Sequence, residues 1–278
     1  VLDQSWAIET SGFERIGDDS VAIRDVLRST GGLAQLTASV SYAVAPSFAI
    51  GIGGGLYTGS VLRQALREFS DTTVALDDFE TRFRWEYRAP LAVAGVRWDP
   101  NPNVRLGGSI TVPGTLDVTA KEGITEGDEV RMPIRAAFGA SAWLASDLLV
   151  AAGAEWSGRG DGESTVFSAG EALRRDTWRY GGGIEYQGLG TATRIFPLRI
   201  GGSYAQLPYY EAGEMPATEW SGSFGMGFRL AGDEAGPLAV ADIGIERGGR
   251  SGLESEQLEG GLSESFWRFT FSLSLFGR

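Results

Sequence analysis

The residues with the clearest capacity for chemistry are charged side chains that alternate with apolar residues along predicted strands. A strand turns successive side chains to opposite faces, so these charges are expected to share one polar face. A guanidinium group donates paired hydrogen bonds to a carboxylate, so this face could hold an acidic head group. A ladder of solvated charges is the alternative, and no single residue stands out. The candidate binding residues are Arg82, Arg84, Arg131, Arg135, Arg179, Glu185 and Arg199.

The composition removes most catalytic chemistry. The chain has 278 residues, without any histidine or cysteine, so His-dependent nucleophiles, His general bases and Cys/His metal sites are excluded. The glycine run at 51–55 lacks the spacing of a phosphate-binding loop. Asp161 and Glu163 offer too few oxygens for Ca²⁺. We therefore expect no enzyme activity, no metal site and no cofactor.

Charge and hydropathy restrict the partners. The formal net charge is -12, which argues against nucleic acid as a partner. The mean hydropathy is -0.08, and no apolar run reaches the roughly 18 residues of a membrane-spanning helix. A membrane-spanning barrel needs no such run, because its strands alternate apolar and polar residues.

The strands that must position these charges are clearest at the C-terminal end. Trp267, Phe269, Phe271, Leu273 and Leu275 alternate with Arg268, Thr270, Ser272 and Ser274. This alternation predicts a strand with an apolar and a polar face. Outer-membrane barrels carry the pattern with the apolar face toward lipid. We expect Phe269, Phe271 and Leu273 to face lipid, and Thr270 and Ser272 to face inward.

Similar segments recur along the chain and give about twelve strands. Short turns (45–46, 99–103, 144–146, 188–194 and 231–236) alternate with longer connections (10–32, 59–75, 119–128, 157–173, 207–216 and 249–263). Two helical pieces are expected inside these connections, at 21–28 and 61–69. The apolar phase changes at Ala89–Pro90, which predicts a bulge or a lateral gap there because proline lacks an N–H donor.

Aromatic residues gather at the predicted strand ends. Trp and Tyr favour the membrane–water interface, since their rings are apolar and their tips polar. The residues near the long connections are Trp6, Tyr57, Trp156, Trp178, Tyr204, Trp220 and Trp267. Those near the short turns are Tyr42, Trp98, Trp143, Tyr186, Phe228 and Phe276. Together with the alternation of turn lengths, this predicts an all-β fold: an antiparallel up-and-down transmembrane β-barrel, with one domain over residues 1–278.

The sequence also resembles the FadL/TodX family of outer-membrane transporters for hydrophobic compounds. The residues that carry the resemblance are 96–100, 104–107, Pro197 to Tyr204, Leu207 to Tyr209, Gly225 to Arg229, Ile245 to Arg250, Glu264 and Trp267 to Leu275. The family's barrel has fourteen strands and an N-terminal hatch. No hatch motif is found here, so we expect the hatch and the first strands to be missing.

The resemblance implies a channel for passive uptake of hydrophobic or amphipathic small molecules such as fatty acids. The expected partners are membrane lipids and the hydrophobic substrate, for a monomer in the bacterial outer membrane with a periplasmic C-terminus. Two alternatives stay open: a general diffusion porin or structural barrel, and a soluble β-sheet protein that binds a ligand.

Overall fold

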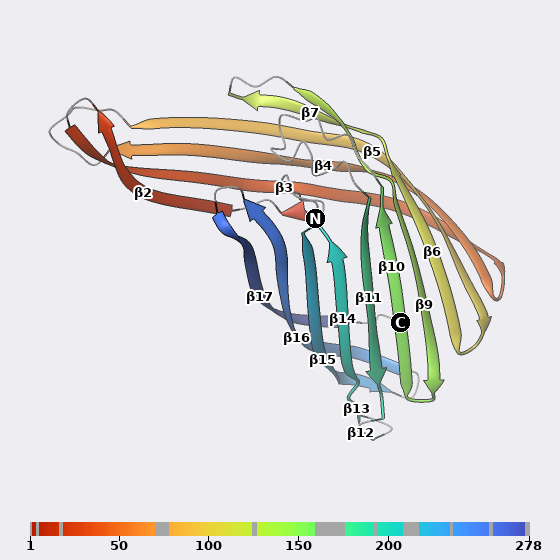
Figure 1. Ribbon diagram of the computed structural model, residues 1–278. Helices are drawn as coiled ribbons and strands as arrows, with labels where there is room; N and C mark the ends of the chain where they lie inside the picture. Colours follow the sequence, from red (N-terminus) through yellow and green to blue (C-terminus); the bar gives the residue numbers. More distant parts are fainter. Residues whose placement is uncertain are drawn as a thin grey trace.

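The computed structural model is a single strongly curved antiparallel sheet (Figure 1). It describes residues 2–3, 6–16, 19–69, 78–123, 127–158, 176–188, 190–191, 194–207, 217–233, 236–255 and 258–275. No helix long and apolar enough to cross a membrane occurs within these ranges. Twelve strands follow one another through the sheet, in the order β1-β3-β4-β5-β6-β9-β10-β11-β14-β15-β16-β17. The prediction of an all-β antiparallel barrel with about twelve strands is confirmed.

The strands of this path have very different lengths. They are β1 (Leu2–Asp3), β3 (Asp19–Ala45), β4 (Phe48–Phe69), β5 (Phe79–Asn101), β6 (Val104–Pro113), β9 (Arg135–Ala145), β10 (Leu148–Ser157), β11 (Thr177–Tyr186), β14 (Leu198–Gln206), β15 (Thr218–Asp233), β16 (Gly236–Ser255) and β17 (Leu258–Leu275). Three further strands lie off this path: β2 (Trp6–Ile16) pairs with β3, β7 (Thr115–Glu122) pairs with β5, and β8 (Asp128–Arg131) pairs with β7. A separate small ladder joins β12 (Gly190–Thr191) and β13 (Arg194–Ile195).

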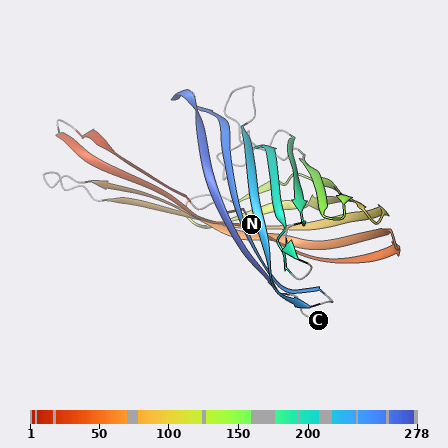
Figure 2. The ribbon, with the colours of Figure 1, turned by 90° about the horizontal axis from the view of Figure 1, so that it is seen from below.

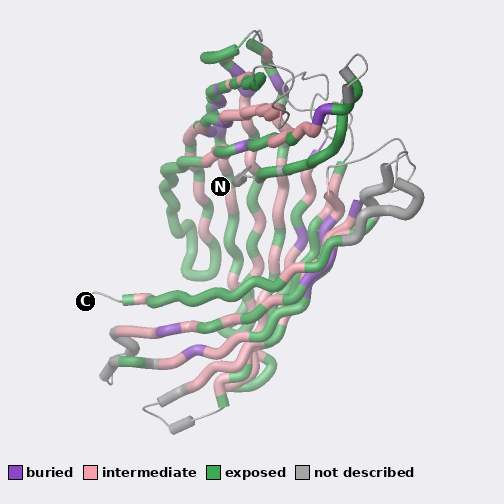
Figure 3. Tube along the Cα trace, turned by 90° about the vertical axis from the view of Figure 1, so that its left-hand side faces the viewer, coloured by how far each residue is buried: buried purple, intermediate pink, exposed green. Residues whose placement is uncertain are grey.

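One side chain, which contacts distant strands of the same sheet, identifies the concave face of the sheet. Arg135 of β9 donates hydrogen bonds to Gln35 of β3 and Tyr57 of β4, although β5 and β6 separate these strands in the sheet. Such a contact is possible only across the concave side. We call the face that carries Arg135 and Tyr57 the inner face and the opposite one the outer face. Buried positions are few along the whole sheet (Figure 3).

The segments expected to be connections with helical pieces are strands. Residues 21–28 lie in β3, where they pair with β2, and from position 23 onward they also pair with β4. Residues 61–69 lie in β4, where they pair with β3, and up to position 67 they also pair with β5. Backbone pairing on both sides outweighs the helical spacing of the apolar residues in these segments. The helix predictions, and the long connections at 10–32 and 59–75, are therefore wrong. The connection expected at 249–263 is wrong as well, because its described residues lie in β16 and β17. At ~3.3 Å per residue the 27 residues of β3 extend for about 90 Å. Figure 2 shows these strands projecting beyond the others.

Pro90 does not interrupt its own strand. The pairing of β4 with β5 runs from Phe48↔Trp98 to Arg67↔Phe79 without a register shift. The irregularity lies on the neighbouring strand, where Gly114 between β6 and β7 donates its N–H to the Pro90 carbonyl at 2.8 Å. One extra residue is accommodated there, because Pro113 pairs with Leu91 and Asp117 with Arg88. The predicted break and lateral gap at Pro90 are wrong, and the bulge belongs to Gly114.

The two margins of the sheet run in the same direction. The chain runs toward the short turns in both β3 and β17, because consecutive strands of the sheet are antiparallel. Among the described residues, positions 34–45 of β3 pair with β4 only, and β17 pairs with β16 only. Closure into an antiparallel barrel therefore requires an odd number of strand segments between these two margins.

Candidate functional site

The outer face carries a continuous apolar band. Ile184, Ile200, Phe224, Ile245 and Phe269 pair directly with one another across five consecutive strands. Each of these side chains is between 36% and 76% exposed. A band of exposed apolar side chains on a barrel wall is what a lipid environment requires. The pairing register confirms that Phe269, Phe271 and Leu273 share this face, opposite Thr270 and Ser272.

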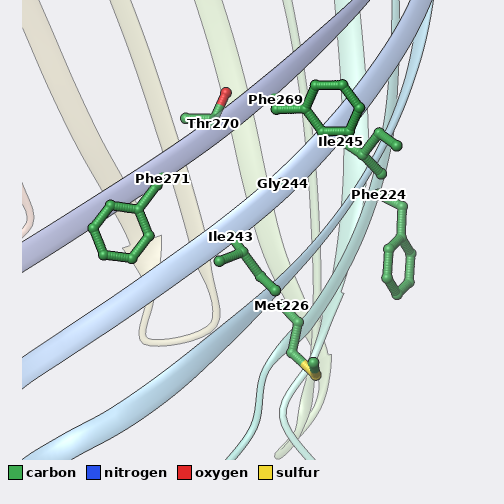
Figure 4. Close-up of a pocket in the computed structure, with 8 residues that line it drawn as sticks. All are labelled: Phe224, Met226, Ile243, Gly244, Ile245, Phe269, Thr270 and Phe271. Carbon is green, nitrogen blue, oxygen red and sulfur yellow. The ribbon is translucent and has the colours of Figure 1, made fainter.

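A shallow hollow of about 450 Å³ lies within this band, over Gly244 and Thr270. Two rows of side chains from β15, β16 and β17 line it (Figure 4). One row is Phe224, Ile245 and Phe269, and the other is Met226, Ile243 and Phe271. The hollow faces outward, so it can accommodate a lipid chain but does not lead through the wall.

Aromatic side chains border the band, as the sequence predicts. Tyr180, Tyr204 and Trp220 pair in one row at the long-connection end of the outer face. Tyr42, Trp98 and Tyr186 are exposed on the same face at the short-turn end. Trp143 is an exception: Arg135 belongs to the same strand and lies eight positions away, so Trp143 points to the inner face. Tyr57 is a second exception, because it is buried on the inner face in the middle of β4. Phe276 lies outside the described residues.

The candidate charges divide between the two faces. Four of them point to the inner face, from strands β9, β11 and β14: Arg135, Arg179, Glu185 and Arg199. Arg82 and Arg84 pair with Gln64 and Leu62 and lie on the outer face, above the apolar band. Arg131 pairs with Thr115, on the side opposite the buried pair Leu116 and Val130. The expectation that Arg82, Arg84 and Arg131 line the inner face is corrected by this register.

The physical reason for this correction is the position of the phase change. β5 keeps one phase from Phe79 to Trp98, so its aromatic residues before Pro90 point inward and the intervening arginines outward. The phase changes instead at Gly114 and at residues 132–134, where the β7–β8 hairpin joins β6 and β9. A proline marks a change of phase in the sequence but does not show which strand adapts.

Arg199 is the centre of an ion-pair network on the inner face. Its Nε lies 2.5 Å from Glu185 of β11, and its Nη1 contacts Asp242 of β16. The intervening strand β15 presents Gly225 and Gly227 at this level. A Cβ at Gly227 would lie 2.8 Å from the Asp242 carboxylate. The missing side chain thus allows the network to cross β15.

Two further inner-face networks were not found from the sequence. Arg250 lies 2.7 Å from Glu219 and 3.3 Å from Glu264, and Arg268 lies 2.7 Å from Glu246. The alternation of β17 predicted a polar-face position for Arg268, whereas Arg250 fell within the expected connection 249–263. The cross-strand register was needed to find the carboxylates that pair with them. These arginines are neutralised by carboxylates of the wall, so this part of the inner face forms a charge ladder.

A compact apolar cluster occupies the inner face of the longer strands. It consists of Tyr57, Val61, Trp85, Tyr87, Ala89, Leu91, Leu116, Val118 and Val130, which are all less than 9% exposed. Phe83 stacks on Trp85 at 5.8 Å between ring centroids, and burial raises the pKa of the Tyr87 hydroxyl. The β7–β8 hairpin contributes Leu116, Val118 and Val130 to this cluster.

Arg135 borders this cluster and differs from the other inner-face arginines. It donates to the Tyr57 hydroxyl and to Gln35 Oε1 at 3.0 Å, and its guanidinium lies 5.9 Å from the Tyr57 ring centroid. No carboxylate among the described residues forms an ion pair with it. The arrangement combines a buried apolar surface with a cation held by neutral partners. No cluster of three acidic side chains suited to a metal occurs in the described ranges.

Comparison with known proteins places this fold. No family model and no curated protein matches the sequence. Among solved structures, a FadL homologue from Pseudomonas aeruginosa matches 94% of this chain and 76% of its own, with a TM-score of 0.56 and 16% identity. The CymD monoaromatic hydrocarbon channel matches 99% of this chain and 87% of its own, with a TM-score of 0.54 and 14% identity. The chain therefore has the fold of these two proteins, an antiparallel β-barrel.

Proposed function

We propose that the protein is an outer-membrane channel for the passive uptake of hydrophobic or amphipathic small molecules. The FadL-like fold and the exposed apolar band support its location. One observation carries the proposal for its cargo: the apolar and aromatic cluster lies on the inner face of the wall, with Arg135 beside it. An apolar molecule that contacts such a surface gains about 25 cal/mol per Å² removed from water.

The long strands give the proposed route its direction. The outer face of β4 and β5 becomes charged above the apolar band, where Leu62 and Gln64 neighbour Arg84 and Arg82. This part of the wall projects into water, and the apolar cluster lies on its inner face. Cargo would meet the cluster before reaching the membrane-embedded part of the barrel. We further propose a monomer of one barrel domain, with the C-terminal end on the periplasmic side.

A general diffusion porin is the second candidate. The ladder formed by Glu185, Arg199 and Asp242 favours it, because ion-paired side chains line the water-filled passages of porins. The apolar cluster argues against it, since a small sugar has little apolar surface to bury against these side chains. A soluble ligand-binding protein is disfavoured by the exposed aromatic rows of the outer face.

Uptake into liposomes separates these functions. Liposomes that contain the full-length protein are supplied with a labelled long-chain fatty acid, 1-decanol or a small sugar. We expect faster entry of the two hydrophobic molecules than in protein-free liposomes and no gain for the sugar. Entry of the sugar with no gain for either hydrophobic molecule would identify a porin and contradict the proposal.

A further inference from the structure

Arg247 of β16 lies on the outer face, at the edge of the apolar band. It pairs with Gly222 of β15 and with Trp267 of β17, and Ile245 of the band lies two residues away on the same strand. Side chains two residues apart on a strand point to the same face. On the other side of Arg247, Trp220 belongs to the row of aromatic side chains that borders the band. Arg247 therefore lies at the level where lipid head groups meet the hydrocarbon of a membrane.

Arg247 has no charged partner in the described part of the wall. Its guanidinium lies 4.9 Å from the ring centroid of Trp267, within the range of a cation–π contact. No carboxylate among the described residues forms an ion pair with it. The carboxylates at neighbouring positions point to the inner face, where each forms an ion pair with Arg250 or Arg268: Glu219, Glu246 and Glu264. The described wall therefore leaves this cation available for an anion of the membrane.

The shallow hollow of the outer face adjoins Arg247. One row of its lining side chains is Phe224, Ile245 and Phe269 (Figure 4). This row is two residues along each strand from the row that contains Arg247, a distance of about 7 Å. A Cβ at Gly222, beside Arg247, would have no atom within 4 Å. The space between the guanidinium and the apolar hollow is therefore open at this point.

A cation at the head-group level and an apolar hollow at the hydrocarbon level are complementary to an anionic lipid. A guanidinium donates paired hydrogen bonds to a phosphate. The indole of Trp220 extends over β16, since its Nε1 lies 3.1 Å from the position of a Cβ at Gly249, two residues from Arg247. Its N–H is a second donor at the same level.

We propose that Arg247 and the hollow form a binding site for a membrane lipid that carries a phosphate. The phosphate binds to Arg247, and one acyl chain lies in the hollow between β15 and β17. Basic side chains beside apolar grooves bind lipid head groups in this way. The site lies on the outside of the wall, so the inference goes beyond the proposed function and does not concern the cargo.

Two lipids with the same acyl chains test this site: dimyristoylphosphatidylglycerol, which has a phosphate, and dimyristoylglycerol, which has none. Their binding to the full-length protein in a non-ionic detergent is measured by native mass spectrometry at equal mole fractions. We expect the native protein to bind the phosphatidylglycerol at least about tenfold more tightly, as charge-assisted hydrogen bonds imply. Arg247→Met should remove this preference. Ile243→Trp, which fills the hollow, should weaken the binding of both lipids.

The matched control is Arg84→Met, which removes an arginine from the outer face of β5, outside the hollow, and should leave the preference unchanged. Heat-modifiable migration in detergent gels shows that each variant is folded. Equal affinities of the native protein for the two lipids, or an unchanged preference in Arg247→Met, would overturn the site. Displacement of the phosphatidylglycerol by an equal concentration of inorganic phosphate would assign Arg247 to a free anion and would also overturn it.

Discussion

The orientation of β17 predicts very different effects for arginine at two adjacent positions. Phe271 is 70% exposed on the outer face, in a row with Met226 and Ile243. Ser272 pairs with Asp242 on the inner face. Arginine on the lipid face near the bilayer midplane costs ~2–4 kcal/mol, and arginine on the luminal face costs much less. Asp242 would also give an arginine at position 272 a nearby carboxylate.

The assay is a urea titration of folding into liposomes for Phe271→Arg, Ser272→Arg and the native protein. A cost of ~2–4 kcal/mol corresponds to a decrease of roughly 30- to 900-fold in the folding equilibrium constant of Phe271→Arg. Ser272→Arg should lie within about tenfold of the native value. Equal destabilisation at the two positions would show that β17 does not separate lipid from the interior and would refute the assignment of faces.

Three further predictions concern the inner face. Gly227→Val should destabilise the barrel by about 1–3 kcal/mol in the same titration, because its Cβ would lie 2.8 Å from Asp242 and from Pro197. Gly222→Ala should be neutral, because the space around Gly222 is open. Equal costs of the two substitutions would refute the argument. The hydrogen bond from Arg67 lowers the pKa of Asp25, so its stabilising effect should be complete above about pH 4 and disappear as the pH falls through the lowered value. Proteolysis of the projecting strands should be faster in Asp25→Asn than in the native protein at pH 7, and the difference should shrink as the pH falls below about 4. A pH-independent difference would contradict this. Arg135→Met should slow fatty-acid uptake more than decanol uptake. Equal slowing would show that Arg135 stabilises the barrel wall and does not bind the cargo.

The sequence was sufficient where one periodicity held along a whole strand. The alternation from Trp267 to Leu275 identified both the strand and its lipid face, because lipid and water demand opposite side chains. The same periodicity did not identify the inner face where the outer face is charged, above the apolar band. Above the apolar band an outward arginine and an outward glutamate are both acceptable, so Arg82 and Arg84 gave no indication of their face.

The most informative residues for function were the least visible in the sequence. Trp85 and Tyr87 alternate with charged residues, and this pattern suits a lipid-facing strand as well as an inward-facing one. Only the regular pairing of β4 with β5 through Pro90 shows that their rings are inside. Long-range register of this kind cannot be read from local periodicity.

The central claim is that hydrophobic cargo moves along the inner apolar face, and cysteine labelling tests it directly. The chain has no cysteine of its own, so one introduced cysteine is labelled uniquely. Val93 packs against the cluster on the inner face, while its neighbour Ala92 is exposed on the outer face. Val93→Cys and Ala92→Cys are modified in detergent with a bulky maleimide and then placed in liposomes. The account predicts that modification at position 93 blocks decanol uptake and that modification at position 92 leaves it unchanged; equal effects at the two positions would contradict it.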